Sequence, residues 1–239
     1  MFIIDCFGYL LSKLISIIDS IILFFNKKTP LDEYIIFYDL ETTGLNPYHS
    51  KIIEIGAMLY SVKDNEVIDR FSSLINPEIP IPEKITKITS INDEMVNDKP
   101  ILDIIMKEFI NFTRLNEKCR LYFVAHNGDS FDKLFLRQNL FNHYETTAEI
   151  VHLDTMRFAQ RLLPNNKSYS LKNLCIHYNI EQEKSHRADE DTNHMFVLYD
   201  KLCDTLSEQI CNTLNKENNI KSYLLSHPLV INDYIYKWK

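Results

Sequence analysis

The chain has 239 residues, of which 45% are hydrophobic and 25% are charged, and this balance is typical of a globular protein with one sizeable core. A formal net charge of −7 argues against a broad basic surface for nucleic acid, although an acidic chain can still recognise a strand end locally. The five cysteines are scattered and form no CxxC pair, which argues against a disulfide scaffold or a zinc module and favours a reducing compartment.

Residues 1–28 form an apolar segment that ends in Lys27 and Lys28. Three charges within residues 1–26 make a poor membrane-spanning helix, and the start of the segment lacks the basic residues of a cleaved signal peptide. Its polar residues line one narrow stripe at helical spacing, which favours attachment to a membrane interface or a protein partner over docking on the domain's own core. On a membrane, the two lysines would lie at the headgroups and place the remaining chain on the cytoplasmic side.

A short linker at 29–33 precedes a globular domain predicted over 34–214. Apolar runs bounded by turn residues predict strands at 34–40, 51–61, 66–75 and 121–125, with a short fifth strand at 151–153. Helical segments are predicted at 83–90, 92–96, 100–114, 130–140, 154–163, 170–177 and 189–214. Three antiparallel strands followed by alternating helices and strands predict an α/β fold with a mixed sheet and helices on its faces. The C-terminal extension 215–239 shows no clear pattern.

Asp39 and Glu41 lie two residues apart at the end of the first predicted strand, so both side chains point to one face of the sheet. Two carboxylates projecting from the end of a buried strand need a compensating cation, and a divalent metal ion is the natural candidate. The alternative is a pair of solvated acids at a strand edge.

Two further acidic positions are predicted near the starts of helices. Asp132 follows the fourth strand and a glycine turn, where its alternative role is to complement the helix dipole. His186 precedes the long helix on a loop, and Asp191 lies in the first turns of that helix. A loop histidine beside a metal-ligating acid suits general-base chemistry. Spacing alone does not distinguish Asp191 from its neighbours Asp189 and Glu190.

These segments resemble the three motifs of the DEDDh family of 3′–5′ exonucleases: Asp39-x-Glu41-Thr-Thr-Gly, His126-Asn-Gly-x-x-Phe131-Asp132 and His186-x-Ala-x-x-Asp191. That family includes the proofreading subunit of bacterial DNA polymerase III and the three-prime repair exonucleases. The stretches 75–95 and 154–164 are similar to the proofreading consensus, except that Ser90 stands where many members have Gly. The resemblance covers roughly residues 34–204 and implies a ribonuclease H-like fold, a mixed five-stranded sheet with helices on both faces.

The resemblance also implies the chemistry. Asp39, Glu41, Asp132 and Asp191 are expected to bind two divalent metal ions, Mg²⁺ or Mn²⁺, and His186 is expected to take the proton of the attacking water. The implied reaction releases nucleoside 5′-monophosphates from 3′ ends, with DNA favoured over RNA and single-stranded or frayed ends preferred. The alternatives are an exoribonuclease of the same fold and a non-catalytic nucleic-acid-binding module, but all five catalytic positions are filled, which favours an enzyme.

Five residues are expected to hold the end of the substrate. Leu45 and Ile88 are expected to pack against the terminal bases, and Phe131 to stack on or support the last nucleotide. Thr42, with nearby backbone amides, is expected to hold the 3′-hydroxyl. Asn127 either bonds the scissile region or caps the turn. Ordinary core packing is the alternative for Leu45 and Phe131.

Overall fold

A computed structural model describes residues 31–181, 187–214 and 220–237. Residues 1–28 and His186, which the sequence singles out, lie outside the described residues. The strands are β1 (Asp32–Thr42), β2 (Ile52–Ser61), β3 (Glu66–Leu74), β4 (Cys119–Ala125) and β5 (Glu149–Asp154). The helices are α2 (Glu83–Thr89), α3 (Asp93–Val96), α4 (Leu102–Thr113), α5 (Asp132–Leu136), α6 (Thr155–Leu162), α7 (Leu171–His177), α8 (Ala188–Leu214), α9 (Lys221–Leu225) and α10 (Pro228–Tyr236), with a π-helical turn η1 (Arg137–Phe141) after α5.

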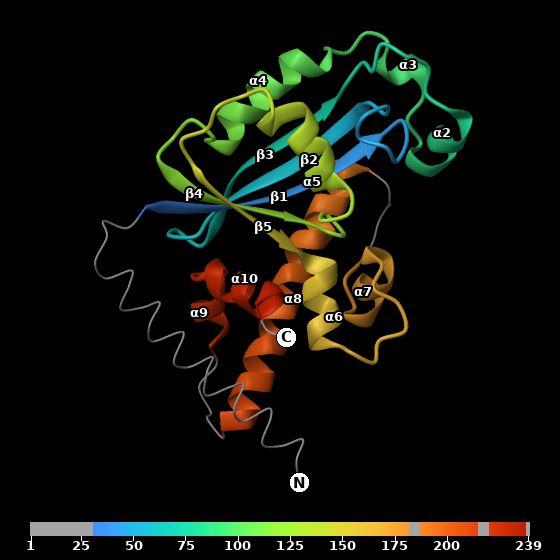
Figure 1. Cartoon of the computed structure of the whole chain (residues 1–239). Coiled ribbons are helices and arrows are strands. Elements are labelled where there is room, and N and C mark those ends of the chain that lie inside the picture. Colours follow the sequence, from blue (N-terminus) through green and yellow to red (C-terminus); the bar gives the residue numbers. More distant parts are fainter. Residues whose placement is uncertain (1–30, 182–186, 215–219, 238–239) are drawn as a thin grey trace.

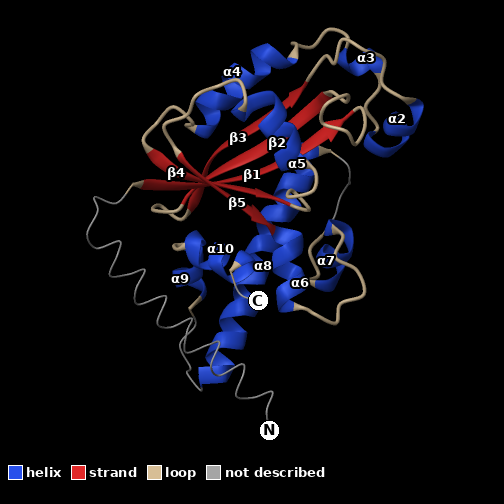
Figure 2. Cartoon of the chain, in the orientation of Figure 1, coloured by secondary structure: helices blue, strands red, loops and turns tan. Residues whose placement is uncertain are grey.

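The five strands form one mixed sheet in the order β3-β2-β1-β4-β5 (Figure 2). β1 pairs antiparallel with β2, and β2 with β3, whereas β4 runs parallel to β1 and β5 parallel to β4. This arrangement confirms the predicted α/β fold. It also places β1 at the centre of the sheet, where its pairing with β2 continues to Thr42 but its pairing with β4 ends at Phe37, so that the carboxyl end of β1 extends beyond its last partner on β4.

Helices cover both faces of the sheet (Figure 1). On one face, α4, α5 and η1 bury an apolar layer with the sheet that includes Phe109, Phe123 and Phe135. On the other face, α6 to α10 bury a second layer that includes Phe37 and Phe158. Because both faces are covered, β2 is buried along its whole length, which fits a sequence that is apolar except for Glu54 and Ser61.

The structure departs from the sequence-based expectation at several element bounds: β1 begins at Asp32, inside the predicted linker 29–33, and β5 covers Glu149–Asp154 where 151–153 was predicted. The helix predicted at 130–140 is divided into the short α5 and the π-helical turn η1. Ser90, where many members of the resembled family have Gly, ends α2 in the left-handed region with φ 61°. This is a conformation in which glycine is usually favoured, so Ser90 adopts it at some cost in backbone strain.

The C-terminal extension also contains structure that the sequence pattern did not reveal. Residues 221–236 form α9 and α10, and α10 begins with Pro228 at its first turn. Val230, Ile231 and Ile235 bury α10 against the core, but helices of five and nine residues are too short to give a clear periodic pattern. Within the described part of the chain, no helix is long and apolar enough to cross a bilayer.

Candidate active site

Three of the predicted carboxylates meet at the carboxyl end of β1. Asp39, Glu41 and Asp191 each offer one oxygen, and these oxygens lie within 4.8 Å of one another. The first two come from β1, and Asp191 comes from the start of α8. They line an open cleft of about 430 Å³ together with Leu40, Leu45, His126, Asn127, Ser130, Phe131 and Asp132. The strand alternation that placed Asp39 and Glu41 on one face therefore holds.

Asp132 lies deeper in the same cleft. It is the first residue of α5, as expected, and it is buried. Its Oδ1 accepts a hydrogen bond of 3.2 Å from the backbone N–H of Leu40, the residue between Asp39 and Glu41. The bond ties α5 to β1, but Asp132 does not belong to the group of three oxygens described above.

The acids of the cleft disfavour one another's ionisation. Burial, followed by the charges of Asp132, Glu41 and Asp191, raises the pKa of Asp39 well above its ordinary value. Burial and neighbouring carboxylates likewise raise the pKa of Glu41 to about 8, and burial raises that of Asp132 to about 7. Carboxylate oxygens are the ligands that Mg²⁺ and Mn²⁺ prefer, and a divalent cation would compensate the charges whose repulsion disfavours ionisation, so these residues fit divalent ions.

A buried ion pair fixes the start of α8 on the sheet. Glu54 of β2 is 1% exposed, and its Oε1 accepts from Nη2 of Arg187 at 2.7 Å. Its Oε2 accepts from the backbone N–H of Ala188, the first residue of α8, at 3.0 Å. Gly56 lies against the same residue, because a Cβ on Gly56 would be 2.2 Å from the carbonyl carbon of Ala188.

This anchoring decides which acid of α8 faces the site. Gly56 pairs with Asp39 in the sheet and Glu54 pairs with Glu41, so the helix start lies directly over the strand residues that carry the carboxylates. Asp191, one turn into α8, therefore joins them, whereas Asp189 is exposed. The sequence analysis did not single out Glu54, although a glutamate inside an apolar strand needs a buried cationic or N–H partner.

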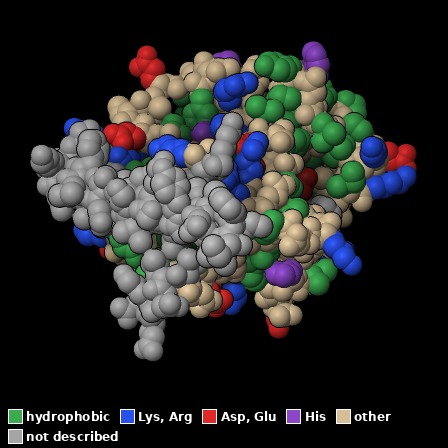
Figure 3. Space-filling model, turned by 60° about the horizontal axis from the view of Figure 1, so that its bottom comes forward, with side chains coloured by type: hydrophobic (Ala, Val, Ile, Leu, Met, Phe, Trp, Pro, Cys, Tyr) green, Lys and Arg blue, Asp and Glu red, His purple; other side chains and the backbone are tan. Residues whose placement is uncertain are grey.

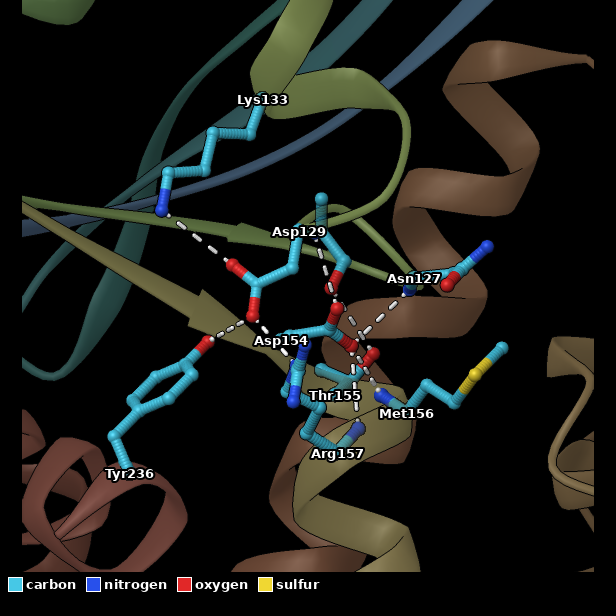
Figure 4. A network of polar contacts seen from close by, with 9 residues as sticks. Asn127, Asp129, Lys133, Asp154, Thr155, Met156, Arg157 and Tyr236 are labelled. Carbon is cyan, nitrogen blue, oxygen red and sulfur yellow. Dashed lines mark hydrogen bonds and ion pairs between the residues drawn. The ribbon is translucent and has the colours of Figure 1, made fainter. Parts of the chain in front are cut away.

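The turn between β4 and α5 is held by a second residue that the sequence analysis did not single out, Asp154 (Figure 4). Asp154 ends β5, and its carboxylate accepts from the backbone N–H groups of Asn127 at 3.2 Å and Asp129 at 3.1 Å. The same carboxylate caps α6 by accepting from the N–H groups of Met156 and Arg157. One buried acid thus joins the cleft turn to the following helix, and the available signal was an aspartate at the very start of the helix predicted at 154–163.

Three of the expected substrate-holding residues line the cleft, namely Leu45, Asn127 and Phe131. Leu45 is 84% exposed at the rim, so core packing does not account for it. Phe131 also packs on Phe135, with ring centroids 5.0 Å apart, and so combines a core contact with a cleft-facing position. Asn127 adopts φ 62°, which fits a residue that closes the turn.

The other two expected residues are placed differently. Ile88 lies on α2, is 44% exposed and is not among the described residues that line the cleft. Thr42 is buried, and its hydroxyl donates to the carbonyl of Gly44 at 2.7 Å, which stabilises the turn after β1. The structure therefore does not bring either side chain into the cleft lining.

His126, which the sequence left as either structural or substrate-facing, has both ring nitrogens engaged by the protein. Nε2 lies 2.8 Å from the carbonyl oxygen of Tyr169 and must donate to it, while Nδ1 lies 2.9 Å from the hydroxyl of Thr155. Burial lowers the pKa of His126, which favours the neutral ring. His126 is thus a structural link at the edge of the cleft.

Comparison with known proteins gives a consistent picture. A family model described as an exonuclease matches residues 36–199. The PolC-type DNA polymerase III of Clostridium perfringens is 39% identical over 160 residues, which cover 67% of this chain and 10% of that protein. The DNA polymerase III subunit epsilon of Treponema pallidum is 33% identical over 171 residues, covering 70% of this chain and 76% of that one.

Solved structures share the fold. A zinc-bound complex of E. coli ExoI with single-stranded DNA superimposes with a TM-score of 0.62 at 16% identity, covering 77% of this chain and 43% of that chain. At this identity the likeness concerns the fold alone. The chain spans about a tenth of the length of the PolC-type relative and less than half of the ExoI chain.

Proposed function

Because the chain belongs to the exonuclease family and carries the three DEDDh motifs, we propose that it is a metal-dependent 3′–5′ exonuclease that releases nucleoside 5′-monophosphates from DNA. The observation that carries this proposal is the meeting of Asp39, Glu41 and Asp191 within 4.8 Å in an open cleft. A module that only bound nucleic acid would gain nothing from three mutually repelling carboxylates, since they would repel the phosphates as well.

The residues of the cleft are proposed to have two roles, metal binding and proton transfer. Asp39, Glu41 and Asp191 would hold two Mg²⁺ or Mn²⁺ ions, with Asp132 contributing from the base of the cleft. When bound, such ions supply positive charge that polarises the scissile phosphate and lowers the pKa of a water molecule. His186 lies outside the described residues, but it precedes Ala188 by two positions, and we propose it as the base that takes the water's proton.

The surroundings of the cleft favour a single strand or a frayed end as substrate. Leu45 at the rim and Phe131 in the lining offer apolar surface to bases irrespective of sequence. Figure 3 shows Lys and Arg side chains beside acidic, apolar and other side chains on one face of the molecule. The formal net charge of −7 supports recognition of a strand end, because a duplex is usually bound through a broad basic surface.

DNA is the proposed substrate because the relatives reported above are DNA polymerases and their subunit, and the ExoI structure is a complex with single-stranded DNA. From the sequence alone, we further propose that residues 1–28 attach the domain 34–214 to the cytoplasmic side of a membrane or to a protein partner. Deletion of residues 1–28 should then move the protein from a membrane pellet to the soluble fraction, and an already soluble, monomeric full chain would contradict this.

The test of the activity is nucleotide release from 3′-labelled single-stranded DNA, duplex DNA and RNA in Mg²⁺ or Mn²⁺. Asp191→Ala and His186→Ala should abolish release while circular dichroism shows an unchanged fold. Asp189→Asn is the matched control, because Asp189 is an exposed acid in the same turn of α8. Release that persists in both alanine variants would refute the assignment. If nucleotides are released preferentially from RNA, the substrate is RNA and not DNA.

A further inference from the structure

The β4–α5 turn supplies neighbouring residues of the cleft. It carries Asn127 and leads into Phe131 and Asp132, all three of which line the cleft. Its backbone is tight, because a Cβ on Gly128 would be 2.5 Å from the Cβ of Ala125. A small displacement of this turn would therefore move three cleft residues together.

Asp129, in the middle of this turn, directs its carboxylate away from the cleft into a set of three donors (Figure 4). Oδ2 lies 2.6 Å from Nε of Arg157 and accepts from the hydroxyl of Tyr236 at 3.1 Å, while Oδ1 lies 3.5 Å from Nζ of Lys133. The side chain of Asp129 is 15% exposed, whereas those of Arg157 and Lys133 are 53% and 39% exposed. Half-exposed ion pairs of this kind contribute little to holding a geometry.

Tyr236 differs from these two cations because it is the last residue of a well-anchored helix. Val230, Ile231 and Ile235 of α10 are buried in the same apolar layer as Phe158 of α6. The ring of Tyr234 adds an edge contact to Phe158, with centroids 5.9 Å apart. A tyrosine side chain has only two rotatable bonds before its ring, so holding its hydroxyl at the turn costs little conformational entropy.

The contact comes from outside the region that matches the exonuclease family. The family match ends at residue 199, and α10 covers Pro228–Tyr236. We propose that α10 is a positioning element of the site and that Tyr236 is a positioning residue, which holds the β4–α5 turn through Asp129 and so sets the placement of Phe131 and Asp132. The kinetic consequence rests on the proposed function, whereas the effect on the turn does not.

The test compares Tyr236→Phe with Tyr234→Phe in the full chain. Both changes remove one hydroxyl from α10, but the hydroxyl of Tyr234 has no hydrogen-bond partner among the described residues. Tyr236→Phe should lower kcat about tenfold with a smaller change in KM, since a hydrogen bond to a charged group is lost and the turn is released. It should also speed hydrogen exchange of the amides at 126–131, and Tyr234→Phe should do neither.

A second variant tests whether Tyr236 acts through Asp129. In an Asp129→Asn background, Tyr236→Phe should cause little further loss, because the two changes interrupt the same contact. Equal losses from the two tyrosine variants, additive losses in the double variant, or unchanged exchange at 126–131 in Tyr236→Phe would each overturn the proposal. If the wild-type chain releases no nucleotide, the proposed function fails, and hydrogen exchange still decides the role of Tyr236.

Discussion

Replacement of Gly56 by alanine should separate the carboxylate on α8 from those on β1. A Cβ at this position would lie 2.2 Å from the carbonyl carbon of Ala188, 2.3 Å from its oxygen and 2.4 Å from the nitrogen of Asp189. These are backbone atoms that cannot rotate away, so the start of α8 must retreat by about 1 Å to restore an ordinary contact. Asp191 lies three residues further along the same helix and must move with it.

The expected result is a large loss of activity with a moderate loss of stability. A misplacement of about 1 Å at a catalytic site costs on the order of a hundredfold in rate, and overpacking costs about 1–3 kcal/mol in the free energy of unfolding. Nucleotide release and urea unfolding of the same preparation measure the two effects.

Ala57→Gly is the matched control, because Ala57 is the next residue of β2 and is buried with the opposite apolar layer, and it should cost about 1 kcal/mol while activity is kept. Full activity in Gly56→Ala, or an equal loss of activity in the control, would refute the argument that this contact sets the site.

Three further predictions concern the surroundings of the cleft. Glu54→Ala leaves Arg187 without its buried partner and should lower the free energy of unfolding in urea by about 3 kcal/mol. Glu83→Ala breaks an exposed ion pair and should lower it by under about 1 kcal/mol. Similar losses in the two variants would contradict the anchoring role of Glu54. The pKa of Glu41 is raised from 4.5 to about 8, so its protonation stabilises the metal-free fold fully below pH 4.5, and this contribution is lost as the pH rises through 8. Between pH 6 and 9 in EDTA, the Tm should therefore fall more for the wild type than for Glu41→Gln, and equal slopes would disprove the charge repulsion. Leu45→Ser should raise KM for single-stranded DNA several-fold without lowering Tm, because the side chain is 84% exposed in the free protein; an unchanged KM would remove Leu45 from the substrate path.

The sequence predicted those parts of the site that depend on local geometry. Strand alternation was enough to place Asp39 and Glu41 together, and the order of strands and helices was enough to predict the mixed sheet. The choice of Asp191 over Asp189 was beyond local reasoning. It depends on how α8 is rotated over the sheet, and the contacts of Gly56 and Glu54 with Ala188 fix that rotation.

The remaining differences between the predicted and the observed site arise from single hydrogen bonds, which produce no periodic pattern in the sequence. The hydroxyl of Thr42 donates to the carbonyl of Gly44. The sequence does not distinguish this contact within the turn from the expected contact with the 3′-hydroxyl of the substrate. Tyr236 reaches Asp129 across 107 positions of the chain through one hydrogen bond at the end of a nine-residue helix. Such long-range polar pairs are visible only when the elements that carry them are assembled.

The central position of β1 affects when the three acids of the site can come together during synthesis. Asp39 and Asp191 are more than 150 positions apart, and β1 gains its parallel neighbour β4 only after Ala125 has been made. Pairings this distant form slowly and late in folding. A nascent chain in which Asp191 has not yet been synthesised contains only two of the three acids that meet in the site. The group of three acids is therefore incomplete in any chain that ends before Asp191, and under the proposed function such a chain would lack part of its metal site.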